Sequence, residues 1–142
     1  MTYSPKPWQS YQKVATQTAT PGQLVLMLYD GAARFLRQAL DGFQLEDPGE
    51  FNLTIHNNIR RAQAIVDELN GSLDMKQGGE LSDKLRGLYN YIDRRLDESN
   101  RQKSPEGIQE SLKHIGVLRD AWSEMLTGNG SGSTGLPQLA VA

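Results

Sequence analysis

Two histidines are the side chains most open to a catalytic interpretation, and neither stands in a catalytic pattern. His56 and His114 lack the Glu-x-x-His partner that di-iron carboxylate bundles use. In a phosphotransfer bundle, a lysine and a small residue typically lie on the turn after the exposed histidine. Bulkier residues stand there in this sequence, namely Ile59 and Arg60 in one case and Val117 and Leu118 in the other. We therefore interpret both histidines as solvated or rim residues.

The other polar groups are interpreted as structural. The glycine-rich phosphate-binding patterns are absent, and Gly78-Gly79 by itself indicates a turn. Arg94-Arg95 is followed by Asp97-Glu98, which favours ion pairs within one helix, with contact to a partner as the alternative. A cluster of acids suits helix capping and solvation: Asp41, Glu46, Asp47 and Glu50. Because cysteine is absent too, we expect no catalytic residue, cofactor or metal site, and hence no enzyme.

Composition narrows the class of partner. The 142 residues are enough for one domain with a single core. Fifteen basic against seventeen acidic side chains leave a formal charge of −2, which argues against nucleic acid as the main partner. The first residues lack the apolar run of a secretory signal, and no stretch reaches the roughly 18–20 apolar residues that span a bilayer. We expect a cytoplasmic protein that does not insert into membranes.

Helical spacing of apolar residues predicts four long helices. Thr20-Pro21-Gly22-Gln23 combines an N-cap threonine, a proline at the first helical position and a capping-box glutamine. Asp47-Pro48 and Ser104-Pro105 repeat the device. The expected helices span about 21–43, 48–72, 80–100 and 105–126. Short connections between long helices predict an all-α, antiparallel up-down-up-down bundle.

Three regions follow from this pattern. Residues 21–126 form the four-helix bundle, and residues 1–20 form an N-terminal covering segment that can make a short helix from about Trp8. Residues 127–142 form a flexible tail rich in glycine and serine.

Some apolar residues exceed what a bundle core needs. Residues 24–29, Leu-Val-Leu-Met-Leu-Tyr, are apolar on every side of the predicted helix. Tyr89 and Tyr91 are also more than the core needs, because Leu88 and Ile92 already define the inward face of their predicted helix. A contiguous apolar surface of this kind usually marks a partner site. The alternative is that the covering segment lies permanently over it, through Trp8, Tyr11 and Val14.

An ordered set of short segments resembles one known family. It begins with Tyr11 and Val14 and closes with Leu118-Arg119-Asp120-Ala121-Trp122, covering roughly residues 8–126. Between them stand Thr20-Pro21-Gly22-Gln23-Leu24, residues 26–32 (LMLYDGA), residues 62–69 (AQAIVDEL), Gly78-Gly79-Glu80 and residues 88–96 (LYNYIDRRL). With this spacing the chain resembles the flagellar secretion chaperone FliS family. Ser99 and Ile92 depart mildly from the family pattern, and the Gly-Ser tail has no counterpart in it.

The resemblance implies a function for the surplus apolar surface. Members of that family are cytoplasmic helical bundles that bind the disordered C-terminal segment of flagellin, prevent its premature polymerisation and keep it competent for flagellar type III secretion. Their N-terminal segment, with a tyrosine matching Tyr11, packs on a hydrophobic groove and yields to the client. Export-gate components or a co-chaperone are further partners to expect. The predicted groove residues are Leu26, Tyr29, Tyr89, Tyr91, Arg95 and Trp122.

Two alternatives stay open at this stage. Tyr29 and Trp122 could be core residues rather than groove residues. The chain could also be a bundle adaptor that binds a folded regulatory protein, since such a protein needs an exposed apolar face as well. The two functions differ in the state of the partner, because a disordered flagellin tail gains helix on binding and a folded partner does not.

Overall fold

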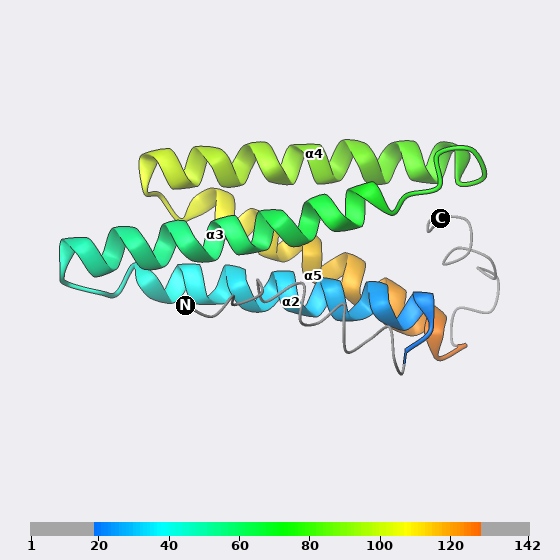
Figure 1. Cartoon of the computed structure of the whole chain (residues 1–142), viewed down its shortest axis with the longest axis horizontal. Coiled ribbons are helices and arrows are strands. Elements are labelled where there is room, and N and C mark those ends of the chain that lie inside the picture. Colours follow the sequence, from blue (N-terminus) through cyan, green and yellow to red (C-terminus); the bar gives the residue numbers. More distant parts are fainter. Residues whose placement is uncertain (1–18, 129–142) are drawn as a thin grey trace, which may run out of the picture.

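The computed structural model describes residues 19–128, and within them the chain forms four helices and no strand. They are α2 (Pro21–Gly42), α3 (Pro48–Gly71), α4 (Gly79–Gln102) and α5 (Glu106–Leu126). α2 and α4 run one way and α3 and α5 the other (Figure 1). α2 and α4 each pack against both α3 and α5. The prediction of an antiparallel up-down-up-down four-helix bundle is confirmed.

Helix starts follow the predicted signals in two of three cases. The Thr20 hydroxyl accepts from the Gln23 backbone N–H, and the Gln23 side chain accepts from the Thr20 N–H, which completes the capping box. The Asp47 carboxylate accepts from the Glu50 N–H at 2.9 Å. α5 differs, because Pro105 takes the N-cap position and no side chain caps the helix, so Ser104 does not have the predicted role.

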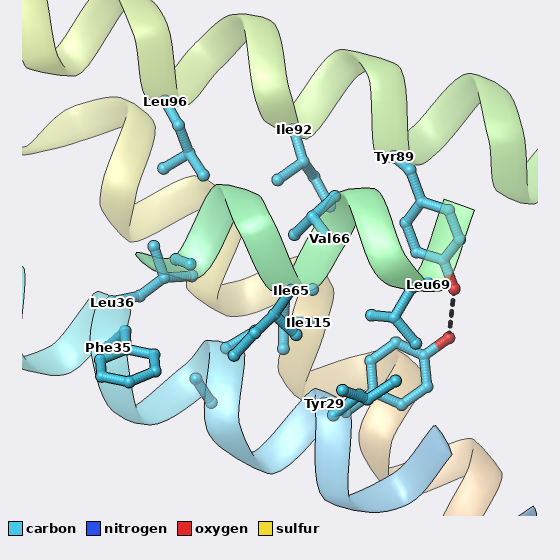
Figure 2. Packing of buried hydrophobic residues seen from close by; sticks show 14 of the residues in the cluster. Tyr29, Phe35, Leu36, Ile65, Val66, Leu69, Tyr89, Ile92, Leu96 and Ile115 are labelled. Carbon is cyan, nitrogen blue, oxygen red and sulfur yellow. Dashed lines mark hydrogen bonds between the residues drawn. The ribbon is translucent and has the colours of Figure 1, made fainter. Parts of the chain in front are cut away.

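The core is apolar and spans all four helices (Figure 2). Its fully enclosed side chains include Leu36 from α2, Ile59 and Val66 from α3, Ile92 from α4 and Ile115 from α5. The residues recur every three or four positions along each helix, which is the spacing of one buried stripe. Within residues 19–128, no helix is long and apolar enough to cross a membrane.

The predicted covering segment and tail cannot be compared with this structure. Trp8, Tyr11 and Val14 lie outside the described residues, as does the tail from residue 129 onward. The boundaries proposed for these regions therefore stay predictions.

Candidate partner-binding surface

Three predicted groove residues, Tyr29, Tyr89 and Trp122, lie together in the core and are called here the aromatic cluster. Figure 2 shows the Tyr29 and Tyr89 side chains pointing toward each other from α2 and α4, with their hydroxyl oxygens 2.5 Å apart. The Trp122 ring on α5 meets the Tyr29 ring edge-on, with centroids 6.3 Å apart. Trp122 Nε1 also donates to the Gly22 carbonyl oxygen at 2.8 Å. Each buried polar atom of the aromatic cluster thus has a partner.

The expectation that Tyr89 projects away from the core was wrong. Tyr89 is 2% exposed, whereas Leu88 is half-buried. Position 89 lies four residues after Leu85 and three before Ile92, so it shares their face of α4. Positions 88 and 89 both fit that periodicity. Tyr89 is the buried one, and its hydroxyl is hydrogen-bonded to that of Tyr29. Tyr29 and Trp122 are core residues as well, at 1% and 4% exposure.

Burial fixes the protonation of the tyrosine pair. Removal from water, opposed by the hydrogen bond from Tyr89, raises the pKa of Tyr29 to about 12. Burial is also the largest cause of the raised pKa of Tyr89, followed by Tyr29 itself. Both hydroxyls are therefore neutral at physiological pH, and neither provides the depressed pKa of an activated nucleophile.

A small cavity adjoins the aromatic cluster. Its volume is about 10 Å³, which is roughly enough for a single water molecule. All three aromatic residues line it, together with Val25, Ser72 and others from the four helices. The cavity is too small for a metabolite or a cofactor, which need several hundred Å³.

Tyr91 and Arg95 form a second group, with Glu110 of α5, called here the polar cluster. The Tyr91 hydroxyl donates to both Glu110 carboxylate oxygens, at 2.8 and 3.0 Å. Arg95 Nε donates to Glu110 Oε1 at 2.7 Å. The Arg95 guanidinium also pairs with Glu98 on its own helix, at 3.5 Å. The polar cluster is half-exposed and joins the outer edges of α4 and α5.

The electrostatics of the polar cluster favour the ionised pair. The hydrogen bond from Arg95, followed by the one from Tyr91, lowers the pKa of Glu110. The same carboxylate raises the pKa of Arg95, chiefly through that hydrogen bond. The Tyr91 and His114 rings meet in a T-shaped contact, with centroids 6.2 Å apart, and the Arg94 guanidinium lies over the Tyr91 ring. The polar cluster therefore links α4 to α5 through an ionised pair at the surface.

Leu26 belongs to neither cluster. It is half-buried on α2, like its neighbours Leu24 and Met27, while Val25 and Leu28 are buried. The expected division of residues 24–29 between core and surface is thus confirmed. Leu26 lies one helical turn after Gly22 and one turn before Asp30, and both of these residues contact α5. Gly22 lies beside Leu126, and Asp30 forms an ion pair with Arg119 at 2.8 Å. It therefore lies on the side of α2 that faces α5.

Sequence reasoning missed Glu110 as the partner of Tyr91 and Arg95. The available signal was the short connection between α4 and α5, residues 103–105, which makes the two helices antiparallel neighbours. Positions before and after such a connection can face each other. Tyr91 and His114, each four residues farther from the connection than Arg95 and Glu110, also meet.

The described residues offer little for catalysis. No group of three or more His, Asp or Glu side chains in residues 19–128 is arranged to hold a metal ion. His56 is exposed and its Nδ1 lies 2.9 Å from the Asn100 side-chain nitrogen, which agrees with its interpretation as a rim histidine.

Comparison with known proteins identifies the family. The family profile described as "Flagellar protein FliS" matches residues 4–129. A flagellar secretion chaperone FliS from Bacillus subtilis is 35% identical over 120 residues, which cover 84% of this chain and 86% of that protein. The FliS chaperone of Salmonella typhimurium is 31% identical over 115 residues, or 78% and 80% of the two chains. That of Campylobacter jejuni is 29% identical over 118 residues, or 83% and 89%.

These matches span the whole bundle with its aromatic and polar clusters, and the chain therefore belongs to the FliS family of flagellar secretion chaperones.

Proposed function

We propose that this chain binds the disordered C-terminal segment of flagellin in the cytoplasm, prevents its premature polymerisation and keeps it competent for flagellar type III secretion. The observation that carries the proposal is the match to this chaperone family over residues 4–129. A chaperone role requires no catalytic group, which agrees with the neutral tyrosines and satisfied polar atoms of the two clusters.

The half-buried apolar residues support a helix-in-groove mode of binding. Leu26 on α2 and Leu118 on α5 pack against the core and are partly exposed to solvent. An amphipathic client helix could lay its apolar face on such residues, while the polar cluster at the rim fixes its register. A disordered client loses conformational entropy on folding, so it must bury on the order of 1,000–3,000 Å² to bind well.

The covering segment gives a route to release. In this proposal, Trp8, Tyr11 and Val14 occupy the groove in the free chain and yield to the client. Competition from a segment of the same chain reduces the net free energy of client binding. The complex therefore stays weak enough to be separated when the client is exported, and export-gate components or a co-chaperone are the partners expected to act then.

Flagellin polymerisation provides the test. Stoichiometric chain added to monomeric flagellin should suppress filament formation, as measured by sedimentation. The variant Leu26→Ala/Tyr91→Ala should suppress it less and bind flagellin about tenfold more weakly, since it removes one apolar contact and one rim contact and each such truncation costs on the order of 1 kcal/mol.

Leu53→Ala is the matched control. Leu53 lies on α3 and is 61% exposed, so its truncation removes apolar surface outside the proposed groove. It should leave binding and suppression unchanged. A folded Leu26/Tyr91 variant that binds flagellin as well as the original chain would sink this site assignment, and failure of the original chain to bind would sink the proposed function.

A further inference from the structure

The connection between α2 and α3 presents apolar side chains to solvent at the end of the bundle opposite the α3–α4 connection (Figure 1). Leu45 is 37% exposed, and Phe43 and Phe51 are half-buried. The two phenylalanine rings meet in a T-shaped contact, with centroids 5.4 Å apart, and both pack against the core. Residues 41–51, called here the hairpin surface, thus offer ordered apolar groups beside water, as partner sites do.

The hairpin surface also concentrates negative charge. Four exposed acids stand in it, namely Asp41, Glu46, Asp47 and Glu50. The chain has no lysine or arginine from residue 38 to residue 59. In the part of the chain that the structure describes, the ion pairs are formed by other residues. The apolar groups are therefore accompanied by carboxylates that no described basic side chain neutralises.

Helix capping accounts for only half of this charge. Asp47 caps α3 by accepting from the Glu50 N–H at 2.9 Å, and Glu50 lies in the first turn, at the positive helix end. Asp41 lies in the last turn of α2, where the negative helix end disfavours a carboxylate and no basic residue stands. Glu46 lies in the connection between the two helices. A cation from outside would stabilise Asp41 and Glu46, whose charge capping does not explain.

We propose that the hairpin surface is a docking site for a segment of a partner protein that carries lysine or arginine beside apolar residues. The apolar side chains pack on Leu45 and the two phenylalanines, and the cations reach Asp41 and Glu46. Nucleic acids and anionic membrane surfaces are repelled by the carboxylates, and the hairpin surface of a second copy brings like charges together.

This docking site is separate from the proposed flagellin groove. Leu26 and Asp41 both lie on α2, about 22 Å apart along the helix axis at 1.5 Å per residue. A basic partner segment can therefore bind while flagellin occupies its groove. The inference does not rest on the proposed function, because it depends only on the hairpin surface.

An NMR titration of the full chain tests the proposal. The probe is a synthetic peptide with leucines at helical spacing and lysines on its remaining faces. It should shift the amide signals of residues 41–51 and bind more weakly as salt rises, since salt screens exposed charges. A second peptide with glutamate in place of each lysine is the control and should not bind. Shifts centred elsewhere on the chain, or equal binding of the two peptides, would overturn the proposal, as would no binding of the lysine peptide.

Charge variants of the chain locate the cation contacts. Asp41→Asn/Glu46→Gln should bind the lysine peptide about fivefold more weakly, the combined effect of losing two exposed ion pairs. The matched control is Asp83→Asn/Glu124→Gln, which removes the same charge from exposed positions on α4 and α5. It should bind like the original chain. Equal weakening by the two variants would show an effect of net charge alone and would contradict a site at the hairpin surface.

Apolar variants locate the other half of the contact. Leu45→Ala should weaken binding of the lysine peptide, because it removes the most exposed apolar side chain of the hairpin surface. Val117→Ala is its control, since Val117 is 62% exposed on α5. Unchanged binding by Leu45→Ala would rule out the apolar contact.

Two competition measurements decide the occupant. Lys6 and Lys13 are the lysines of residues 1–18, which contain no acid, so this segment is the competing occupant within the chain. Lys6→Ala/Lys13→Ala should leave binding of the lysine peptide unchanged, whereas tighter binding would assign the hairpin surface to residues 1–18 and overturn the external partner. A peptide from the C-terminal end of flagellin should not displace the lysine peptide. Displacement would overturn the separation of the two sites.

Discussion

At the residue scale, the tyrosine pair shows why an expected surface residue can be buried. A tyrosine hydroxyl costs free energy to bury unless it finds a hydrogen-bond partner. Tyr29 and Tyr89 are 60 positions apart in the sequence and satisfy each other inside the core. No spacing rule within one helix could reveal that partner, because it depends on how α2 and α4 lie across the bundle.

Substitution of one tyrosine should therefore cost more than substitution of both. Tyr89→Phe leaves the Tyr29 hydroxyl buried without its partner and should lower the free energy of unfolding by about 1–3 kcal/mol. Adding Tyr29→Phe removes the stranded group and should restore part of that loss. Urea unfolding of both single variants and the double variant gives the coupling energy. Strictly additive losses would show that the hydroxyl contact does not stabilise the fold.

The polar cluster was half-predictable. The sequence singled out Tyr91 as apolar surface beyond the needs of the core and Arg95 as an ion-pairing or partner-contacting residue, and both side chains are half-buried on α4. Glu110 was missed, because an acid four residues into a helix resembles any solvated residue. Its role as the partner of Arg95 follows only from the way α4 and α5 lie against each other in the folded chain.

At the element scale, most helix boundaries could be predicted because their signals are local. The Thr20 capping box and the Asp47 cap involve residues three positions apart. The end of α4 lies beyond the predicted fading at Ser99-Asn100, because Lys103 adopts a positive φ of 49° and its Nζ donates to the Asn100 carbonyl oxygen at 2.7 Å. This cap depends on a conformation that lysine rarely adopts, so the residue type did not predict it.

The crossing of α4 and α5 depends on a glycine. A Cβ at Gly107 would collide with the Arg95 carbonyl oxygen and with Ser99 Oγ, both on α4. Gly107→Ala should therefore push the helices apart and lower the free energy of unfolding by about 1–3 kcal/mol. Thermal or urea unfolding measures this loss.

Gly116→Ala is the matched control on the same helix. A Cβ there meets nothing within 4 Å, so the better helix propensity of alanine should raise the free energy of unfolding by up to about 1 kcal/mol. Opposite signs for the two variants would support the close approach at Gly107. Equal effects would contradict it.

At the scale of the whole molecule, the bundle leaves apolar surface beyond its core. Each helix buries one stripe, and α2 also carries Leu24, Leu26 and Met27 partly exposed. The fold class could be predicted from helix lengths and short connections, because these alone force antiparallel neighbours. The burial of individual residues was harder to predict: three of the six predicted groove residues, Tyr29, Tyr89 and Trp122, are core residues, because their burial depends on how neighbouring helices lie.

The central claim is that this surface folds a disordered flagellin segment. The most direct measurement is a titration of the chain with a peptide from the C-terminal end of its cognate flagellin, followed by calorimetry and circular dichroism. We predict one-to-one binding with a gain of helix and a negative heat-capacity change, because the client folds as it buries apolar surface. No binding at concentrations up to about 50 µM, with the bundle folded, would contradict the account. Binding without any gain of helix would contradict the folding of the client and favour an adaptor for a folded partner.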